Sequence, residues 1–178
     1  MVENGEKWVK VGQIGGKGSP TNIVNFPRSR TSSQLMTGDI MFTGEHERLL
    51  DEKGRLVLPP TFRRRLVRAA FLTKSPNDPC LLVYSEEEIG KATERLIEQV
   101  QKNEVSPHAQ RRWAASISEV RADGQGRIAV PSKLRNQIGL EREVILIGVI
   151  NRAEIWTPDE WRNIEETTEI NPNESQWL

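Results

Sequence analysis

The sequence predicts an α+β fold, mainly β, that is built from two copies of one structural unit. Each copy is marked by the motif Asp-x-x-Gly-Arg, a short apolar strand and a proline, at residues 51–59 and again at 123–131. The offset that relates Asp51 to Asp123 also matches Glu47 with Glu119 and Glu88 with Glu160. A register that holds without a gap from residue 47 to residue 88 predicts an internal repeat, because one short motif can recur by chance but a long register rarely does.

The composition is that of a globular protein without a disulfide framework. The chain has 178 residues, 25 basic and 25 acidic side chains, and Cys80 as its single cysteine. One cysteine leaves no intrachain disulfide and no thiolate metal cluster, and we predict that Cys80 is buried and inert. No apolar run approaches the roughly 18 residues of a membrane span, and the N-terminus lacks the apolar core of a signal peptide. These observations predict a soluble, cytoplasmic protein with no membrane partner.

Changes in composition divide the chain into five predicted segments. Residues 1–40 are rich in Gly, Ser, Thr and Asn and have no regular hydrophobic period, which predicts a disordered extension, or a start codon further along at Met36 or Met41. The other segments are a first repeat at 41–90, connecting helices at 91–115, a second repeat at 116–162 and an acidic, disordered tail at 163–178.

Within each repeat the pattern predicts a β-hairpin, a short helix, a second pair of strands and a further helix. In the first hairpin Asp51 opens a type I turn and Gly54 closes it. Prolines then end the second strand and open the helix, in which Phe62, Leu66 and Val67 are predicted to face inward. The elements expected in the first repeat and the connection are strands at 45–50, 55–58, 70–73 and 80–84 and helices at 61–68, 86–101 and 107–115. Those expected in the second repeat are strands at 118–122, 127–130, 144–150 and 153–156, a helix at 132–138, and a last helix that begins near Pro158 and fades after Ile164.

A repeat of this size buries too little surface to be stable alone. Two repeats on one chain can build a shared core, so we predict that they are related by an internal pseudo-two-fold axis.

The two turns carry side chains that suit contacts with double-stranded DNA. Arg55 and Arg127 each follow a turn glycine, and a guanidinium group can bind guanine O6 and N7 together. Lys53 suits phosphate, and because Gln125 takes its place in the second turn, the first turn is predicted to bind phosphate more strongly. The alternative for each arginine is an ion pair with the aspartate four residues before it, and both roles can hold at once.

Other charged residues have a structural interpretation beside the functional one. The run Arg63–Arg65 with Arg68 is typical of a solvated helix face, although an oligomer on DNA could recruit it. Arg48 and Arg121 are secondary candidates for DNA contacts. The three acids at 86–88 are interpreted as a helix start, in which Ser85 is the N-cap and Glu88 completes a capping box.

The sequence Met41-Phe42-x-Gly44 and the two Asp-x-x-Gly-Arg motifs closely resemble the MraZ family of bacterial regulators, over about residues 41–165. The resemblance implies a tandem AbrB-like swapped-hairpin β-barrel with short flanking helices, and a ring-shaped homo-oligomer that is associated with the nucleoid. It implies sequence-specific binding to G-rich direct repeats in the chain's own promoter, at the head of the division and cell-wall gene cluster. The residues expected to bind DNA are Arg48, Lys53, Arg55, Gln125 and Arg127. Those expected to hold the turns are Asp51, Gly54, Asp123 and Gly126, since a carboxylate that faces phosphate is unfavourable.

Two other functions compete with DNA binding. Related swapped-hairpin proteins bind toxins through a C-terminal tail, so an antitoxin-like interaction module that uses residues 165–178 is the alternative. An enzyme is disfavoured, because the sequence has no nucleophile–base pair and no metal-ligand spacing. The glycine-rich stretch 15–19 lacks residues of a phosphate loop, with Val11 and Gly18 at two required positions. We therefore expect no catalytic residue, no metal, no cofactor and no small-molecule substrate.

Overall fold

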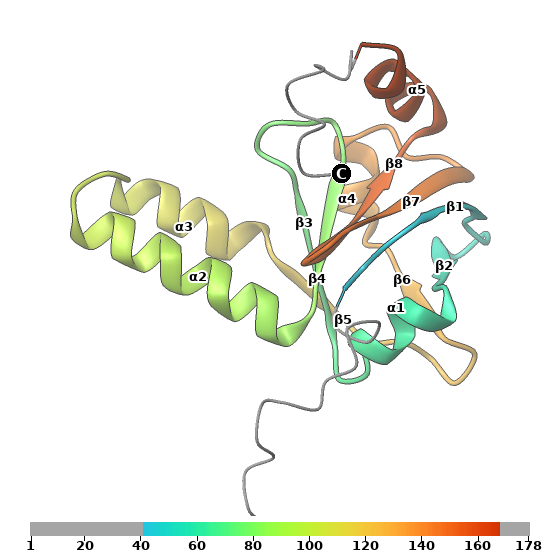
Figure 1. Ribbon diagram of the computed structural model, residues 1–178, viewed down its shortest axis with the longest axis horizontal. Coiled ribbons are helices and arrows are strands. Elements are labelled where there is room, and N and C mark those ends of the chain that lie inside the picture. Colours follow the sequence, from blue (N-terminus) through green and yellow to red (C-terminus); the bar gives the residue numbers. More distant parts are fainter. Residues whose placement is uncertain (1–40, 168–178) are drawn as a thin grey trace, which may run out of the picture. The chain divides into compact units, whose positions relative to one another are not determined.

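The computed structural model describes residues 41–167, and all thirteen elements predicted for these residues are present (Figure 1). The first repeat contains β1 (Glu45–Leu49), β2 (Arg55–Val57), α1 (Pro60–Arg65), β3 (Ala70–Lys74), β4 (Leu81–Tyr84) and α2 (Glu86–Gln101). After α3 (Pro107–Ser116), the second repeat contains β5 (Ser118–Val120), β6 (Arg127–Ala129), α4 (Ser132–Gln137), β7 (Glu143–Val149), β8 (Arg152–Trp156) and α5 (Pro158–Thr167). The predictions for 1–40 and for 168–178 lie outside the described residues.

The internal repeat is confirmed by the order of the elements and by their hydrogen bonds. β2 and β6 are equivalent at the offset that relates Asp51 to Asp123, and so are α1 and α4. Leu58 N donates to Gly126 O at 3.0 Å, and its equivalent Val130 N donates to Gly54 O at 2.9 Å. Leu56 and its own equivalent, Ile128, are register partners in the antiparallel pair of β2 and β6. This reciprocity is that of a pseudo-two-fold axis between the two strands.

The prediction that the register has no gap is wrong within β3 and β7. Phe71 pairs with Tyr84 in the first repeat and Ile145 pairs with Trp156 in the second. Tyr84 and Trp156 keep the offset of the two motifs, whereas Ile145 lies two positions further from Phe71 than that offset allows. Two residues are therefore added before β7 and removed again in the tight turn between β7 and β8, which restores the offset and hides the shift from a sequence comparison.

The predicted hairpins and the predicted barrel are corrected by the strand pairing. β1 pairs with β7 and β2 with β6, and between β1 and β2 the described residues form only the single bridge of Leu50 with Leu56. The strands that flank each turn thus diverge and pair with strands of the other repeat. All ladders are antiparallel: the order is β1-β7-β8-β4-β3-β5 in a six-stranded sheet, and β2-β6 form a separate two-stranded ribbon. The sheet keeps two edges, at β1 and β5, so residues 41–167 form no closed barrel; the broader α+β, mainly antiparallel class is confirmed.

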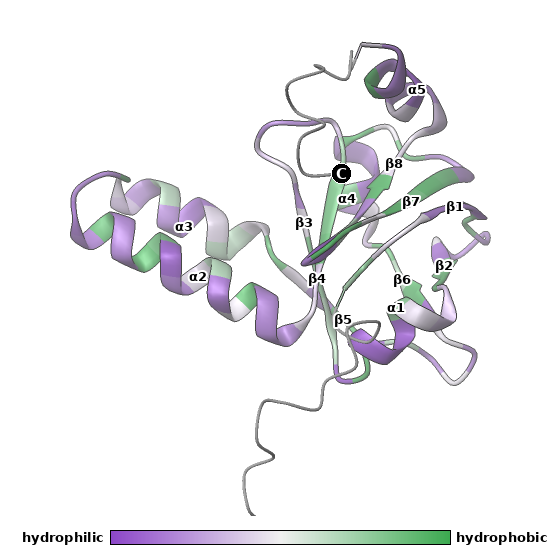
Figure 2. Ribbon diagram, viewed as in Figure 1, coloured by the Kyte–Doolittle hydropathy of each residue, from purple (hydrophilic) through white to green (hydrophobic). Residues whose placement is uncertain are grey.

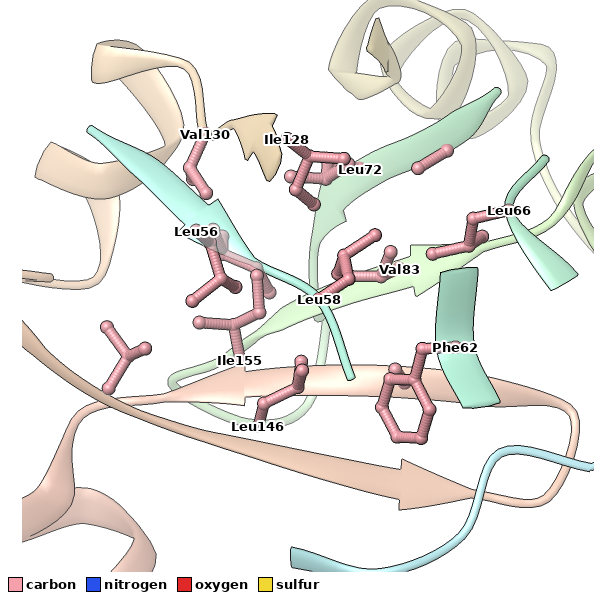
Figure 3. Packing of buried hydrophobic residues seen from close by; sticks show 14 of the residues in the cluster. Leu56, Leu58, Phe62, Leu66, Leu72, Val83, Ile128, Val130, Leu146 and Ile155 are labelled. Atoms are coloured by element: carbon pink, nitrogen blue, oxygen red, sulfur yellow. The ribbon is translucent and has the colours of Figure 1, made fainter. Parts of the chain in front are cut away.

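The main core lies between one face of the six-stranded sheet, the ribbon, α1 and α4 (Figure 3). Leu56, Leu72, Ile128 and Ile155 are fully buried there. Phe62 of α1 is also fully buried, and its ring meets that of Phe42 edge to face at 5.1 Å.

The prediction that Val67 faces inward is wrong. Leu66 is buried as expected, but α1 ends at Arg65 and Val67, two residues later, is 76% exposed. Val67 therefore no longer follows the helical period that places Phe62 in the core.

A second apolar cluster covers the opposite face of the sheet, beside α2 and α5. Figure 2 shows hydrophobic residues along β4 and β7 and alternating hydrophilic and hydrophobic residues along α2. Cys80 belongs to this cluster, as predicted for a buried thiol, and burial raises its pKa to about 12.

The predicted start of α2 is confirmed, whereas the predicted end of α5 is too early. Ser85 Oγ caps α2 by accepting from Glu88 N at 3.3 Å, and Thr157 Oγ1 accepts from Glu160 N at 3.3 Å in the equivalent place before α5. α5 continues to Thr167, beyond Ile164, so residues 163–167 are helical and do not belong to the predicted disordered tail.

Gly148 of β7 leaves no space for a side chain, because a Cβ atom there would overlap Thr43 N and the carbonyl carbon of Phe42. The close approach is fixed by the hydrogen bond from Gly148 N to Gly44 O, at 2.8 Å. We expect Gly148→Ala to destabilise the fold by roughly 1–3 kcal/mol, measured by chemical denaturation. Gly90→Ala in α2 is the matched control: an added Cβ meets no atom within 4 Å, and alanine favours the helix by up to about 1 kcal/mol. Equal stability of the two variants would contradict the prediction.

Candidate nucleic-acid interface

The first turn is held by the carboxylate of Asp51. Its Oδ1 accepts from Lys53 N at 3.0 Å and from Arg55 N at 2.9 Å, and its Oδ2 accepts from Arg55 Nε at 2.6 Å. Gly54 N donates to Asp51 O at 2.8 Å and Gly54 has a φ of 70°, a conformation that glycine adopts most readily. The sequence Asp-x-x-Gly-Arg therefore encodes this turn locally.

The second turn repeats this geometry atom for atom. Asp123 Oδ1 accepts from Gln125 N and Arg127 N, each at 3.0 Å, and Oδ2 accepts from Arg127 Nε at 2.7 Å. Gly126 has a φ of 73°. Since β2 and β6 are antiparallel and each follows its own turn, the two turns lie at opposite ends of the ribbon.

The ion-pair interpretation of both motif arginines is the one that the geometry shows. The guanidinium of Arg127 contacts Asp123 through Nε and Nη2, both at 2.7 Å. Arg55 Nη1 also approaches Asp123 Oδ2 at 4.0 Å, which links the two turns. The side chains of Arg55 and Arg127 are only 30% and 24% exposed. Each keeps a partly exposed guanidinium, so a contact with DNA is compatible with the ion pair.

The pKa values of the two aspartates reflect the same hydrogen bonds with the motif arginines. Hydrogen bonds from the side chain and backbone of Arg127 lower the pKa of Asp123 to about 2. The backbone amide and side chain of Arg55 also lower the pKa of Asp51. Both carboxylates are therefore ionised at neutral pH and hold the arginines in place.

The side chains at the tips of the turns point to solvent. Lys53 and Gln125 are both exposed, and only their backbone amides are used by the turns. Within residues 41–167 the Lys53 ammonium has no ion-pair partner. The tip of the first turn thus presents the ammonium of Lys53 beside the exposed carboxylate of Glu52, and the tip of the second presents an amide.

Arg63 and Arg135 are equivalent residues beside the turns. The sequence placed Arg63 on a solvated helix face that an oligomer on DNA could recruit, and it gave Arg135 no role in the site. Arg135 Nε donates to Val130 O at 3.1 Å, and a Cβ added to Gly54 would lie 2.8 Å from Arg135 Cζ. Arg63 Nε donates to Leu58 O at 2.8 Å and covers Gly126 in the same way. Each turn is therefore flanked by an arginine from the helix of the other repeat. The matched positions were visible in the sequence, but the contact across the axis was not.

A groove of about 610 Å³ runs beside the first turn. It is lined by four basic residues and three acidic ones: Lys53, Arg55, Arg135, Arg142, Asp51, Glu52 and Glu141. Two of the four cations, Arg135 and Arg142, come from the second repeat, and Arg142 O accepts from Leu50 N at 2.8 Å.

The remaining basic candidates are not brought to the turns. Arg48 donates to Glu47 O at 2.7 Å and lines a separate groove. The same groove is lined by one more cation, Arg162, and by four acidic residues: Glu45, Glu47, Glu143 and Glu165. Arg121 pairs with Glu119. Arg68 contacts Glu86 at 3.4 Å, and Arg65 lies over the Phe42 ring at 4.7 Å. The helix-face interpretation of residues 63–68 fails for Arg63 and for Arg65, whose guanidinium packs against an aromatic ring.

The part of the chain that the structure describes contains no group of acidic, histidine or cysteine side chains that could hold a metal ion. None of its helices is long and apolar enough to cross a membrane.

The comparison with known families matches one family over two segments of the chain. The family described as "MraZ protein, putative antitoxin-like" matches residues 41–112 and 114–176. These two segments contain the two repeats and together cover most of the chain. The chain belongs to the MraZ family.

Individual MraZ proteins align over most of the chain. A protein of Saccharopolyspora erythraea named "Transcriptional regulator MraZ" is 40% identical over 122 residues, which is 68% of this chain and 85% of that protein. Proteins with the same name from Alcanivorax borkumensis and Alkaliphilus metalliredigens are each 37% identical, over 131 and 134 residues, and 90% and 93% of their lengths are covered. The resemblance to MraZ that the motifs suggested is thus confirmed.

Proposed function

We propose that this chain is a transcriptional regulator that binds double-stranded DNA in a sequence-specific manner through its two turns. The observation that carries the proposal is that one turn geometry, flanked by an arginine without an acidic partner in residues 41–167, recurs at both ends of a single ribbon. The names of the MraZ relatives support it. A rigid turn that presents Lys, Arg or Gln matches the donor and acceptor pattern of the major groove.

The role of each residue in DNA binding follows from whether an acidic partner holds its side chain. Arg63 and Arg135 are positioned for phosphate, because they have no acidic partner within residues 41–167. The exposed ammonium of Lys53 suits either phosphate or the edge of a guanine. Arg55 and Arg127 are held by the turn aspartates, which gives them the fixed orientation that base contacts require. Gln125 lies at the exposed tip of the second turn, and its backbone amide is held by Asp123. Asp51, Gly54, Asp123 and Gly126 shape the turns. Arg48 is a weaker candidate than the sequence indicated, because acidic residues predominate in the groove that it lines.

The family resemblance supplies the finer part of the proposal. The chain would form a ring-shaped homo-oligomer and bind G-rich direct repeats in its own promoter, ahead of the division and cell-wall genes. Several weak turn contacts in a ring add up along repeated sites, because each further contact is intramolecular once the first has formed. Strand pairing between the repeats is compatible with a swapped-hairpin description of each unit.

Fluorescence-anisotropy titration tests the proposal. The full chain would be titrated against DNA from its own promoter, and against DNA with the G-runs scrambled, at several salt concentrations. We expect preferential binding to the native DNA and a steep loss of affinity with salt, because phosphate contacts release counterions. Equal, weak binding to both DNAs would overturn the proposal.

The antitoxin-like alternative is favoured by the wording of the family description. It assigns partner binding to residues 165–178, most of which lie outside the described residues. Deletion of this segment separates the two functions: loss of a co-purifying protein with DNA binding intact would support the interaction module.

A further inference from the structure

The two turns share one backbone but differ in the side chains at their tips. Glu52 and Lys53 stand in the first turn where Gly124 and Gln125 stand in the second, and all four residues are exposed. The residues that build the turns are the same in both: aspartate, glycine and arginine, with the arginine of the opposite helix alongside. The repeat thus makes a nearly symmetric platform with unequal tips.

A symmetric platform cannot choose a direction on DNA. If the two turns were identical, rotation about the pseudo-two-fold axis would exchange them, and a subunit would bind a given sequence equally well in either orientation. Direct repeats present every element in the same orientation, so a protein that reads them needs a feature that breaks this symmetry. The need for such a feature rests on the proposed function, in which the chain binds direct repeats.

We propose that residues 52–53 and 124–125 are the specificity determinants that set the orientation of each subunit on its DNA element. A lysine donates to guanine O6 and N7, and a neighbouring glutamate accepts from the N4 amino group of the paired cytosine. The first turn therefore suits a G·C pair. Glutamine donates to adenine N7 and accepts from adenine N6, so the second turn suits an A·T pair.

Charged residues lie beside both turns. The groove beside the first turn is lined by Arg135 and Arg142, and also by Glu141. The tip of the second turn carries no lysine, and Arg63 of α1 lies against its glycine, Gly126. The G-rich end of each element is therefore expected to lie under the first turn and the other end under the second.

An exchange of the tips tests the proposal without altering composition or net charge. The exchanged variant is E52G/K53Q/G124E/Q125K, and the variant G124E/Q125K makes both tips Glu-Lys. In each background Glu141→Cys places a thiol in the groove beside the first turn, where an iron chelate can be attached to cleave nearby DNA. Cys80 is fully buried and remains unlabelled under native conditions. The DNA carries a single element of the native promoter.

The wild-type tips are expected to give cleavage at one end of the element, in excess over the other end by about tenfold or more, which is the discrimination of one good base contact. The exchanged variant should cleave at the opposite end, and the variant with equal tips should cleave at both ends, with a much smaller excess of one over the other than the wild-type tips give. An exchanged variant that cleaves at the wild-type end would overturn the proposal, as would equal cleavage at both ends by the wild-type tips. No binding by any protein, the wild type included, would instead overturn the proposed function.

Discussion

Leu56→Ala and Ile128→Ala are each expected to destabilise the fold by about 2–5 kcal/mol, the usual range for removal of a large aliphatic side chain from a packed core. Both residues are fully buried and are register partners across the pseudo-two-fold axis (Figure 3). They face the main core from the ribbon, whereas the flanking Val57 is exposed. Loss of either side chain leaves a cavity under the strand pair that carries both turns.

Chemical denaturation at several protein concentrations measures this effect and separates folding from assembly. Val57→Ala is the matched control, because Val57 lies next to Leu56 in β2 but is 41% exposed. It should change the free energy of unfolding by less than about 0.5 kcal/mol. The double variant should lose less than the two single losses together, since the residues share a cluster. If both single variants behave like this surface control, the ribbon is not part of the cooperative core.

The sequence was informative where structure is decided locally. Asp51 and Gly54 specify a turn through their own hydrogen bonds and backbone conformation, so the turn and its copy could be predicted without knowledge of the fold. The same holds for Ser85, whose hydroxyl group caps α2. The elements at 132–137 and 152–156 followed from the repeat.

Long-range choices could not be predicted in this way. A turn between two apolar runs favours a hairpin, yet β1 and β2 take partners from the other repeat, because the shared core, not the turn, decides the pairing. The shift of two residues between β3 and β7 is compensated in the next turn and leaves no trace in the flanking register. The contact of Arg135 with Gly54 depends on the pairing of strands between the two repeats, so no local signal could indicate it.

Arg63→Gln together with Arg135→Gln is expected to weaken binding to promoter DNA. We expect a loss of at least about tenfold for each arginine replaced, because a hydrogen bond to a charged group contributes about 1.5–3 kcal/mol. The motif arginines are held by Asp51 and Asp123, whereas Arg63 and Arg135 are anchored only through Nε to a carbonyl group. Their terminal nitrogen atoms have no acidic partner in residues 41–167 and lie beside the turns. Within each turn the aspartate neutralises the charge of the motif arginine. Arg63 and Arg135 therefore supply the positive charge beside the turns.

Affinity measured against salt concentration distinguishes this role from a structural one. Each lost phosphate contact lowers the slope of log K against log salt by about 0.9, and a merely loosened turn would leave the slope unchanged. Arg121→Gln is the control, since Arg121 is exposed and paired with Glu119. Arg63→Lys with Arg135→Lys keeps the charge but not the anchoring fork, so it should retain the slope and recover part of the affinity. If the glutamine variant keeps the slope and binds within about twofold of the wild type, the partly exposed Arg55 and Arg127 must carry the contact with DNA despite their ion pairs.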